Sequence, residues 1–305
     1  LPYIFWLTGS GLLGPDEPRY AAIGIAMAES GDWITPKLWG NAWFEKPPLN
    51  YWLTASFRQI GFSPEWAVRL PVALLGFCFL FAMPTVDAAL ILGTSLGFLS
   101  LSQVGITDLP LTVCFNAWLL LLVQRRTRWA GVFLGFAVLA KGLVPLVLCL
   151  PVAWLFRRQW QWILTMLLTA APWYLACYVQ NGQVFFNEFI VKHHISRFVS
   201  PDLQHVQPFW FYLPVLAGFF LPWTPLLASI RPNEGNRPYW WTFLWGIVFL
   251  SVSTNKLPAY ILPVLPSLAI LAAPHLRRWH LAFAGAVFVS LPAVAPWVPA
   301  ALEEG

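Results

Sequence analysis

The chain has 305 residues, of which 58% are hydrophobic and only 10% charged, and its formal net charge is +5 at pH 7. A soluble globular domain carries about 25% charged residues, so this composition excludes a soluble fold and indicates an integral membrane protein. The positive charge does not indicate nucleic-acid binding, because the arginines fall between apolar runs and form no basic patch.

Apolar runs recur along the whole chain, and a bilayer core about 30 Å thick takes about 20 helical residues. We predict an all-α polytopic membrane protein, a single transmembrane domain over residues 1–305 with about eleven spans and no soluble C-terminal domain. The predicted spans lie near 1–13, 66–83, 86–104, 109–124, 129–140, 143–156, 161–178, 208–230, 239–252, 258–274 and 281–299.

Short basic turns set the predicted orientation, because cytoplasmic loops carry an excess of lysine and arginine. If the chain leaves the cytoplasm through its first span, every basic turn falls on the cytoplasmic side. These turns contain Arg125, Arg126, Arg128, Arg157, Arg158, Arg231, Arg237, Arg277 and Arg278. We therefore expect a multi-pass protein with two long outer loops, 14–65 and 179–207, and short outer turns near 105–108 and 253–257.

The predicted outer side concentrates charges of both signs. Ionisable groups near the bilayer are costly and commonly mark function, so this face is where we expect chemistry. The outer carboxylates are Asp16, Glu17, Glu29, Asp32, Glu45, Glu65, Asp108, Glu188 and Asp202, and the cations are Lys37, Lys46, Lys192, Arg197 and Lys256.

The first outer loop opens with Asp16 and Arg19, before an apolar stretch that predicts an amphipathic helix on the membrane surface. Asp16 suits either an N-cap of that helix or a carboxylate base steered by Arg19. Farther along, Pro47 follows Glu45 and Lys46 directly and stiffens the backbone that carries them. Lys46 suits either a phosphate ligand or an interfacial lysine paired with Glu45.

Two further charges lie at predicted span ends. Asp108 precedes Leu-Pro in a short outer turn and suits either a helix cap or a second acid of the site. Lys141 lies where two apolar spans meet on the outer side. An uncompensated lysine there is costly, so we expect it to pair with a carboxylate such as Asp16.

The second long loop adds a possible phosphate clamp and metal ligands. Arg197 has the planar fork that binds phosphate oxygens in pairs. His193 or His194 could share a divalent metal with Glu45, although adjacent histidines on a helix do not usually both reach one ion. In the last outer turn, Lys256 precedes Leu-Pro and faces the same compartment.

The segments GPDEPRYA, FEKPPLNYWL, AKG, HHISRF, HVQPFWFY and STNKLPAYILPVLP occur in this order over roughly residues 10 to 270. They resemble the bacterial 4-amino-4-deoxy-L-arabinose lipid A transferase family and the related dolichyl-phosphate-mannose-type protein mannosyltransferases. The resemblance implies a short form of the GT-C architecture, a polyprenyl-phosphate-linked sugar donor and an active site at the periplasmic face of the bacterial inner membrane.

The resemblance also implies roles for individual residues. Asp16 matches the acid of the first loop, which acts as base or orients the acceptor, and Asp108 matches a second acid of the cavity. Arg19 and Lys141 match family residues that position the first acid. The residues implied as donor-phosphate ligands are Lys46 and Arg197, with Lys256 added from its place on the same face; those implied as ligands of a metal such as Zn²⁺, Mg²⁺ or Mn²⁺ are Glu45 and His194 or His193.

We therefore predict an inverting glycosyltransferase that moves a sugar from an undecaprenyl-phosphate-type donor to a glycolipid, glycan or protein acceptor. The alternative is a flippase or transporter for the same lipid, which predicts charges deep within the spans along a path. A scaffold protein without chemistry leaves the density of outer charges unexplained.

Overall fold

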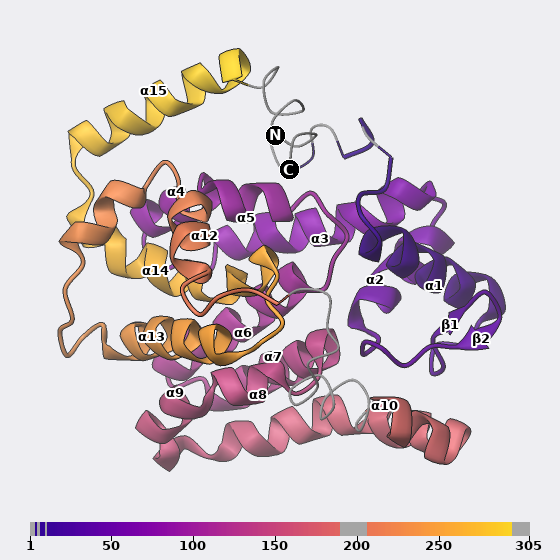
Figure 1. The fold of residues 1–305 in the computed structure, drawn as a ribbon. Coiled ribbons are helices and arrows are strands. Elements are labelled where there is room, and N and C mark those ends of the chain that lie inside the picture. The colour runs from indigo at the N-terminus through magenta and orange to yellow at the C-terminus, as the bar shows by residue number, and fades with distance from the viewer. Residues whose placement is uncertain (1–3, 5–6, 10, 190–205, 295–305) are drawn as a thin grey trace.

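The computed structural model describes residues 4, 7–9, 11–189 and 206–294. Helices predominate in this part of the chain, as predicted (Figure 1). The first outer loop folds into helices α1 (Asp16–Ser30) and α2 (Leu49–Gln59), joined through a short antiparallel pair of strands, β1 (Lys37–Leu38) and β2 (Asn41–Ala42). The two strands were not predicted.

The helices after this loop form the main bundle. They are α3 (Pro64–Leu80), α4 (Val86–Gly93), α5 (Leu96–Leu101), α6 (Asp108–Val123), α7 (Thr127–Lys141), α8 (Val144–Leu148), α9 (Leu150–Leu155), α10 (Gln161–Phe185), α12 (Tyr212–Phe219), α13 (Arg237–Val252) and α14 (Leu265–Ala272). Helix α15 (Arg278–Val294) follows them and lies apart from the bundle (Figure 1). Short 3-10 segments are η1 (Arg157–Gln159), η3 (Thr224–Ser229), η4 (Pro258–Val264) and η5 (Ala273–His275).

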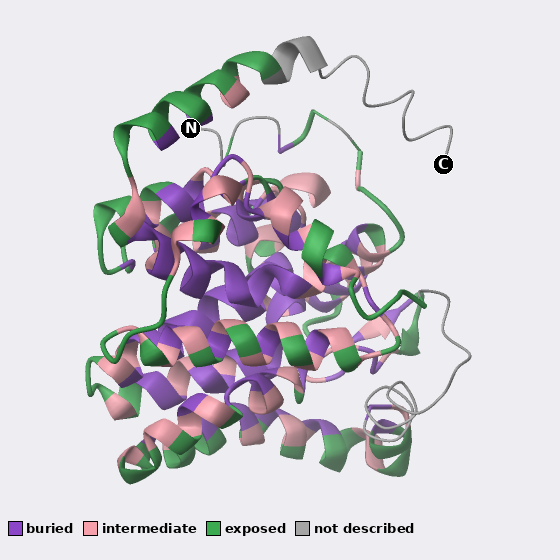
Figure 2. Ribbon diagram, turned by 60° about the vertical axis from the view of Figure 1, so that its left-hand side comes forward, coloured by how far each residue is buried: buried purple, intermediate pink, exposed green. Residues whose placement is uncertain are grey.

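Helix α6 forms the centre of the bundle. Nearly all of its residues are buried, as the purple ribbon at the centre of Figure 2 shows. It packs against α3, α7 and η4. Helix α7 then packs along α10, where Gly131 and Gly135 let the two backbones approach closely. A methyl group on Gly131 would overlap the carbonyl of Trp162, so this contact requires a glycine. Small residues allow such close helix packing in membrane proteins.

The surface of α10 suits contact with lipid. Leu164, Leu168 and Leu175 are 54%, 65% and 64% exposed, which a soluble protein would not leave uncovered along one helix. Among the described residues, two helical segments are long and apolar enough to cross a membrane, Gln161–Phe189 and Pro258–His275, and Asp108–Val123 is a shorter apolar helix. The predicted count of about eleven spans is therefore not confirmed.

Helix breaks explain why the predicted runs do not each give one long helix. The run at 86–104 divides into α4 and α5 near Thr94 and Ser95, and the run at 143–156 divides into α8 and α9 at Cys149. The run at 208–230 contains α12 and η3, with Pro222 and Pro225 between or inside them. Proline removes a backbone donor and ends or kinks a helix, which hydropathy alone does not register.

Candidate functional site

The charged residues of the first outer loop form a row of alternating sign. Asp16 and Arg19 lie one turn apart on α1, and the Arg19 guanidinium donates to the Asp16 carboxylate. The same nitrogen, Nη2, lies 3.4 Å from Glu45 Oε2, and Glu45 Oε1 lies 3.3 Å from Lys46 Nζ. Asp16 is the first residue of α1, whose N-cap is Pro15, so the N-cap interpretation of Asp16 was wrong.

Burial and the charges within this row shift the pKa values of Arg19 and Tyr51. Glu45 is only 7% exposed, and the Lys46 side chain is 13% exposed. Burial alone lowers the pKa of Arg19, but the Glu45 and Asp16 carboxylates outweigh it and leave that pKa above its usual value. Burial and then the Glu45 charge raise the pKa of the Tyr51 hydroxyl, which stays protonated behind the row.

A second ion pair joins two helix ends. The Lys141 ammonium, at the end of α7, donates to the Asp108 carboxylate at the start of α6. It also lies 4.1 Å from the centroid of the Tyr260 ring, which is within the range of a cation–π contact. Lys141 thus pairs with a carboxylate, as its position predicted, but the partner is Asp108 and not Asp16. The reason is that α6 and α7 are joined by a short turn, which brings the first residue of one beside the last of the other.

A cavity of about 320 Å³ lies between these groups and is here called the site cavity. Its polar lining comes from Glu45, Lys46, Lys141, Ser253, Asn255 and Tyr260. Its apolar lining comes from Pro47, Leu111, Leu143, Val144, Val147, Phe249 and Leu250. A cavity with two cations among its polar groups and an extended aliphatic wall suits a ligand that combines an anionic group with a hydrocarbon chain.

Four predicted site residues do not line the site cavity, namely Asp16, Arg19, Asp108 and Lys256. Asp108 forms an ion pair with Lys141, which lines the cavity. Asp16 is linked through Arg19 to Glu45, which also lines the cavity. Lys256 is 4% exposed, and its Nζ donates to the Gln207 carbonyl at 2.9 Å, so it ties the last outer turn to the end of the second long loop. Burial lowers the pKa of Lys256.

The remaining predicted residues cannot be placed. His193, His194 and Arg197 lie outside the described residues. Within residues 11–189 and 206–294, no group of three or more His, Cys, Asp or Glu side chains is arranged to hold a metal ion. The histidines predicted to share a metal with Glu45 belong to the second long loop.

No role was predicted for Glu17 and Arg69, which form a buried ion pair. Both side chains are almost fully buried, at 0% and 2% exposed, and Arg69 Nη2 lies 2.7 Å from Glu17 Oε2. A signal for it was present, because Arg69 interrupts the apolar run at 66–83, and a charged residue within a span should pair. Tyr260 was missed as well, and nothing in its local sequence separates it from other interfacial aromatics.

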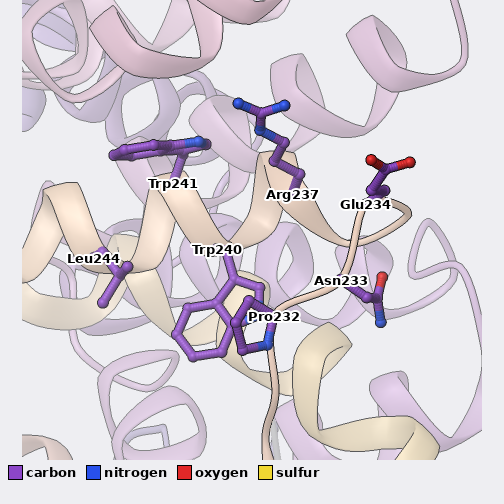
Figure 3. A pocket seen from close by; sticks show the side chains of 7 residues that line it. All are labelled: Pro232, Asn233, Glu234, Arg237, Trp240, Trp241 and Leu244. Atoms are coloured by element: carbon purple, nitrogen blue, oxygen red, sulfur yellow. The ribbon is translucent and has the colours of Figure 1, made fainter.

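A second hollow, of about 440 Å³, lies at the other end of α13 (Figure 3). Pro232, Asn233, Glu234, Arg237, Trp240, Trp241 and Leu244 line it. The site cavity instead contacts Phe249 and Leu250 near the end of the same helix. A helix of 16 residues is about 24 Å long, so this hollow is not part of the candidate site.

No protein-family model matches the chain. It is 33% identical over 312 aligned residues to the undecaprenyl phosphate-alpha-4-amino-4-deoxy-L-arabinose arabinosyl transferase of Pseudomonas paraeruginosa strain DSM 24068 / PA7, an alignment covering 88% of this chain and 56% of that protein. The enzyme of the same name from Edwardsiella ictaluri strain 93-146 is 31% identical, with coverage of 91% and 58%. The chain thus spans little more than half the length of these curated relatives.

Solved structures match as well. The crystal structure of ArnT from Cupriavidus metallidurans bound to undecaprenyl phosphate superposes with a TM-score of 0.79 at 30% sequence identity, covering 91% of this chain and 58% of that one. The apo state of the same protein gives a TM-score of 0.78 at 27% identity, with coverage of 91% and 57%.

Proposed function

We propose that the chain belongs to the family of the undecaprenyl phosphate-alpha-4-amino-4-deoxy-L-arabinose arabinosyl transferases and that it is a membrane glycosyltransferase. Its donor is a sugar linked to undecaprenyl phosphate or a similar polyprenyl phosphate. Its acceptor is a lipid A-like glycolipid, another glycan or a protein. The observation that carries the proposal is the site cavity, where Lys46 and Lys141 stand beside an aliphatic wall.

The proposal includes the architecture and location of the enzyme. It is a GT-C protein with about eleven spans in the bacterial inner membrane, and its 14–65 and 179–207 loops face the periplasm. The exposed leucines of α10 support contact with lipid. The basic turns between the apolar runs support this orientation, because they would all lie in the cytoplasm.

In the proposed reaction, an acceptor oxygen attacks the anomeric carbon of the donor sugar, and the bond from that carbon to the phosphate oxygen breaks. The anomeric centre inverts, and polyprenyl phosphate leaves with the bonding electrons. Lys46, which lines the site cavity, stabilises the departing phosphate, and Arg197 is proposed to do the same from the second long loop. Glu45 and Arg19 hold Lys46 and Asp16 in one connected row.

Asp16 has one of two roles, depending on the acceptor. With a hydroxyl acceptor, Asp16 accepts the proton as the new bond forms. A lipid A phosphate is already largely ionised near neutral pH, since its second pKa is about 6, and Asp16 then orients it without taking a proton. Asp108 is the second acid of the proposed site, and its ion pair with Lys141 holds it beside the site cavity, which Lys141 lines.

A metal is a separate part of the proposal. Glu45 with His194 or His193 would ligate a divalent ion such as Zn²⁺, Mg²⁺ or Mn²⁺, and such an ion would add positive charge beside the phosphate. Elemental analysis of the purified protein and of a Glu45→Gln variant tests this. A stoichiometric metal that is lost in the variant supports the assignment, and a metal-free, active enzyme contradicts it.

A transporter of the same lipid predicts charges along a path through the helices. In the described part of the chain, the charged groups of the candidate site lie at helix ends, with Asp108 first in α6 and Lys141 last in α7, which favours the enzyme. The deciding experiment follows radiolabelled sugar from undecaprenyl phosphate-linked 4-amino-4-deoxy-L-arabinose to lipid A with purified protein in detergent. Label in the acceptor supports a transferase. If no label is transferred, and the same protein reconstituted in vesicles moves the donor across the membrane, the proposal is refuted.

A further inference from the structure

Glu17 and Arg69 form a paired, two-pronged contact inside the protein. Arg69 Nε donates to Glu17 Oε1 at 2.8 Å, and Arg69 Nη2 donates to Glu17 Oε2 at 2.7 Å. Glu17 lies on α1, directly after Asp16, and Arg69 lies on α3. The contact therefore fixes the start of α1 against α3 with both nitrogen–oxygen bonds in one plane.

The same two side chains hold the backbone on both sides. The Gly105 N–H donates to Glu17 Oε1 at 2.7 Å, and the Leu13 N–H donates to Glu17 Oε2 at 2.6 Å. Arg69 also donates to the carbonyl of Gly11 at 2.7 Å. The pair thus connects the segment before α1 with the turn before α6, two segments that are far apart in the sequence.

Gly105 is held from its other side as well. Its carbonyl accepts a hydrogen bond from Asn50 Nδ2, on α2, at 3.1 Å. There is no space for a larger residue, because a methyl group at Gly105 would overlap the Val68 side chain and lie 2.9 Å from the Val68 carbonyl. The turn before α6 is therefore clamped by α1, α2 and α3, and Asp108 follows Gly105 by three residues.

We propose that Glu17 and Arg69 are positioning residues that hold the Asp16 and Asp108 carboxylates at a fixed separation across the candidate site. This rests on the proposed function, because it assigns both carboxylates to the transfer reaction. A buried ion pair is weak evidence of a stabilising role, since well-packed apolar side chains of similar size often serve stability equally well. The geometry of reacting groups depends more strongly on such a pair, because a displacement of about 1 Å in a reacting group lowers the rate by about 100-fold.

The test separates placement from stability with matched variants of the complete chain. Glu17→Gln alone breaks the pair, and the double variant Glu17→Leu with Arg69→Met replaces it with apolar groups. The control is Asp32→Asn with Lys37→Met, an ion pair of the same loop that lies outside the site cavity. For each protein, the thermal unfolding midpoint, kcat and KM for sugar transfer, and the Kd for undecaprenyl phosphate are measured.

We expect Glu17→Gln to lower both the thermal midpoint and kcat. The double variant removes the unpaired charge but leaves the Gly105 and Leu13 N–H groups without an acceptor, so it should recover only part of the midpoint. It should keep a kcat lowered by about 100-fold, with the Kd for undecaprenyl phosphate unchanged. The control should retain wild-type kcat. Recovery of kcat together with the midpoint in the double variant means that the pair serves stability alone and overturns the proposal.

Two further measurements test the proposal if the double variant does not fold or if the wild-type chain is inactive. If the double variant does not fold, Asn50→Ala removes only the outer bond to Gly105 and must still lower kcat without changing the Kd; an unchanged kcat overturns the proposal. If the wild-type chain transfers no sugar, the proposed function fails by itself. Hydrogen–deuterium exchange then tests whether Glu17 and Arg69 hold the two segments together. If they do, Glu17→Gln raises the exchange rate in residues 13–19 and in residues 102–108.

Discussion

Replacing Lys46 with methionine should weaken binding of undecaprenyl phosphate. The Lys46 side chain lines the site cavity and is only 13% exposed, so a bond from its ammonium to a phosphate is little screened by water. A hydrogen bond to a charged group contributes about 1.5–3 kcal/mol, which corresponds to an increase in Kd of about 10- to 150-fold. Methionine keeps the length and the apolar stem, so packing should change little.

The assay is direct binding of undecaprenyl phosphate to the purified variant in detergent. Lys37→Met is the matched control, because Lys37 lies in the same outer loop but on β1, is 39% exposed and pairs with Asp32 at 3.0 Å. The control should bind with the wild-type Kd. If Lys46→Met binds as tightly as the wild type, or both variants lose the same affinity, the placement of the phosphate at Lys46 is refuted.

Three other predictions address the remaining charges. Lys141→Met leaves Asp108 buried without this cation, at a cost of about 3–5 kcal/mol, and should lower the thermal midpoint; an unchanged midpoint would count against the pair. Asp16→Asn should slow transfer to a hydroxyl acceptor by about 100- to 10,000-fold but transfer to lipid A phosphate less; equal wild-type rates on both acceptors remove Asp16 from the mechanism. Burial raises the pKa of Asp32, but the Thr35 N–H and Lys37 outweigh it and hold that pKa below its usual value. The contribution of the Asp32 carboxylate to the free energy of unfolding is thus complete above about pH 4 and is lost on further acidification. In Asp32→Asn, the thermal midpoint should therefore fall less steeply with acid than in the wild type. An identical fall in both proteins contradicts this.

Local spacing predicted the parts of the site that depend on neighbouring residues. Asp16 and Arg19 are three apart at a helix start, and Glu45 and Lys46 are adjacent, so their contacts follow from the sequence once α1 is recognised. Helices α6 and α7 also lie where the apolar runs predicted them, because the polar turn between them interrupts the hydrophobic pattern clearly.

Partner choice over long distances could not be predicted in this way. The Glu17 contact with Arg69 joins residues 52 positions apart on α1 and α3, and hydropathy does not say which helices pack together. The pairing of Lys141 with Asp108, by contrast, follows from the short turn that joins α6 to α7. The number of spans could not be predicted from hydropathy, because turns and prolines divide apolar runs that look continuous in the sequence.

In the proposed enzyme, the site cavity receives a polyprenyl phosphate with its anionic end at Lys46. An experimental structure of the chain with undecaprenyl phosphate tests this directly. We expect phosphate density within ionic contact of Lys46 and the isoprenoid chain along Leu111, Val147 and Phe249. Lipid density elsewhere, with Lys46 still closed onto Glu45 and the site cavity filled by side chains, would contradict it.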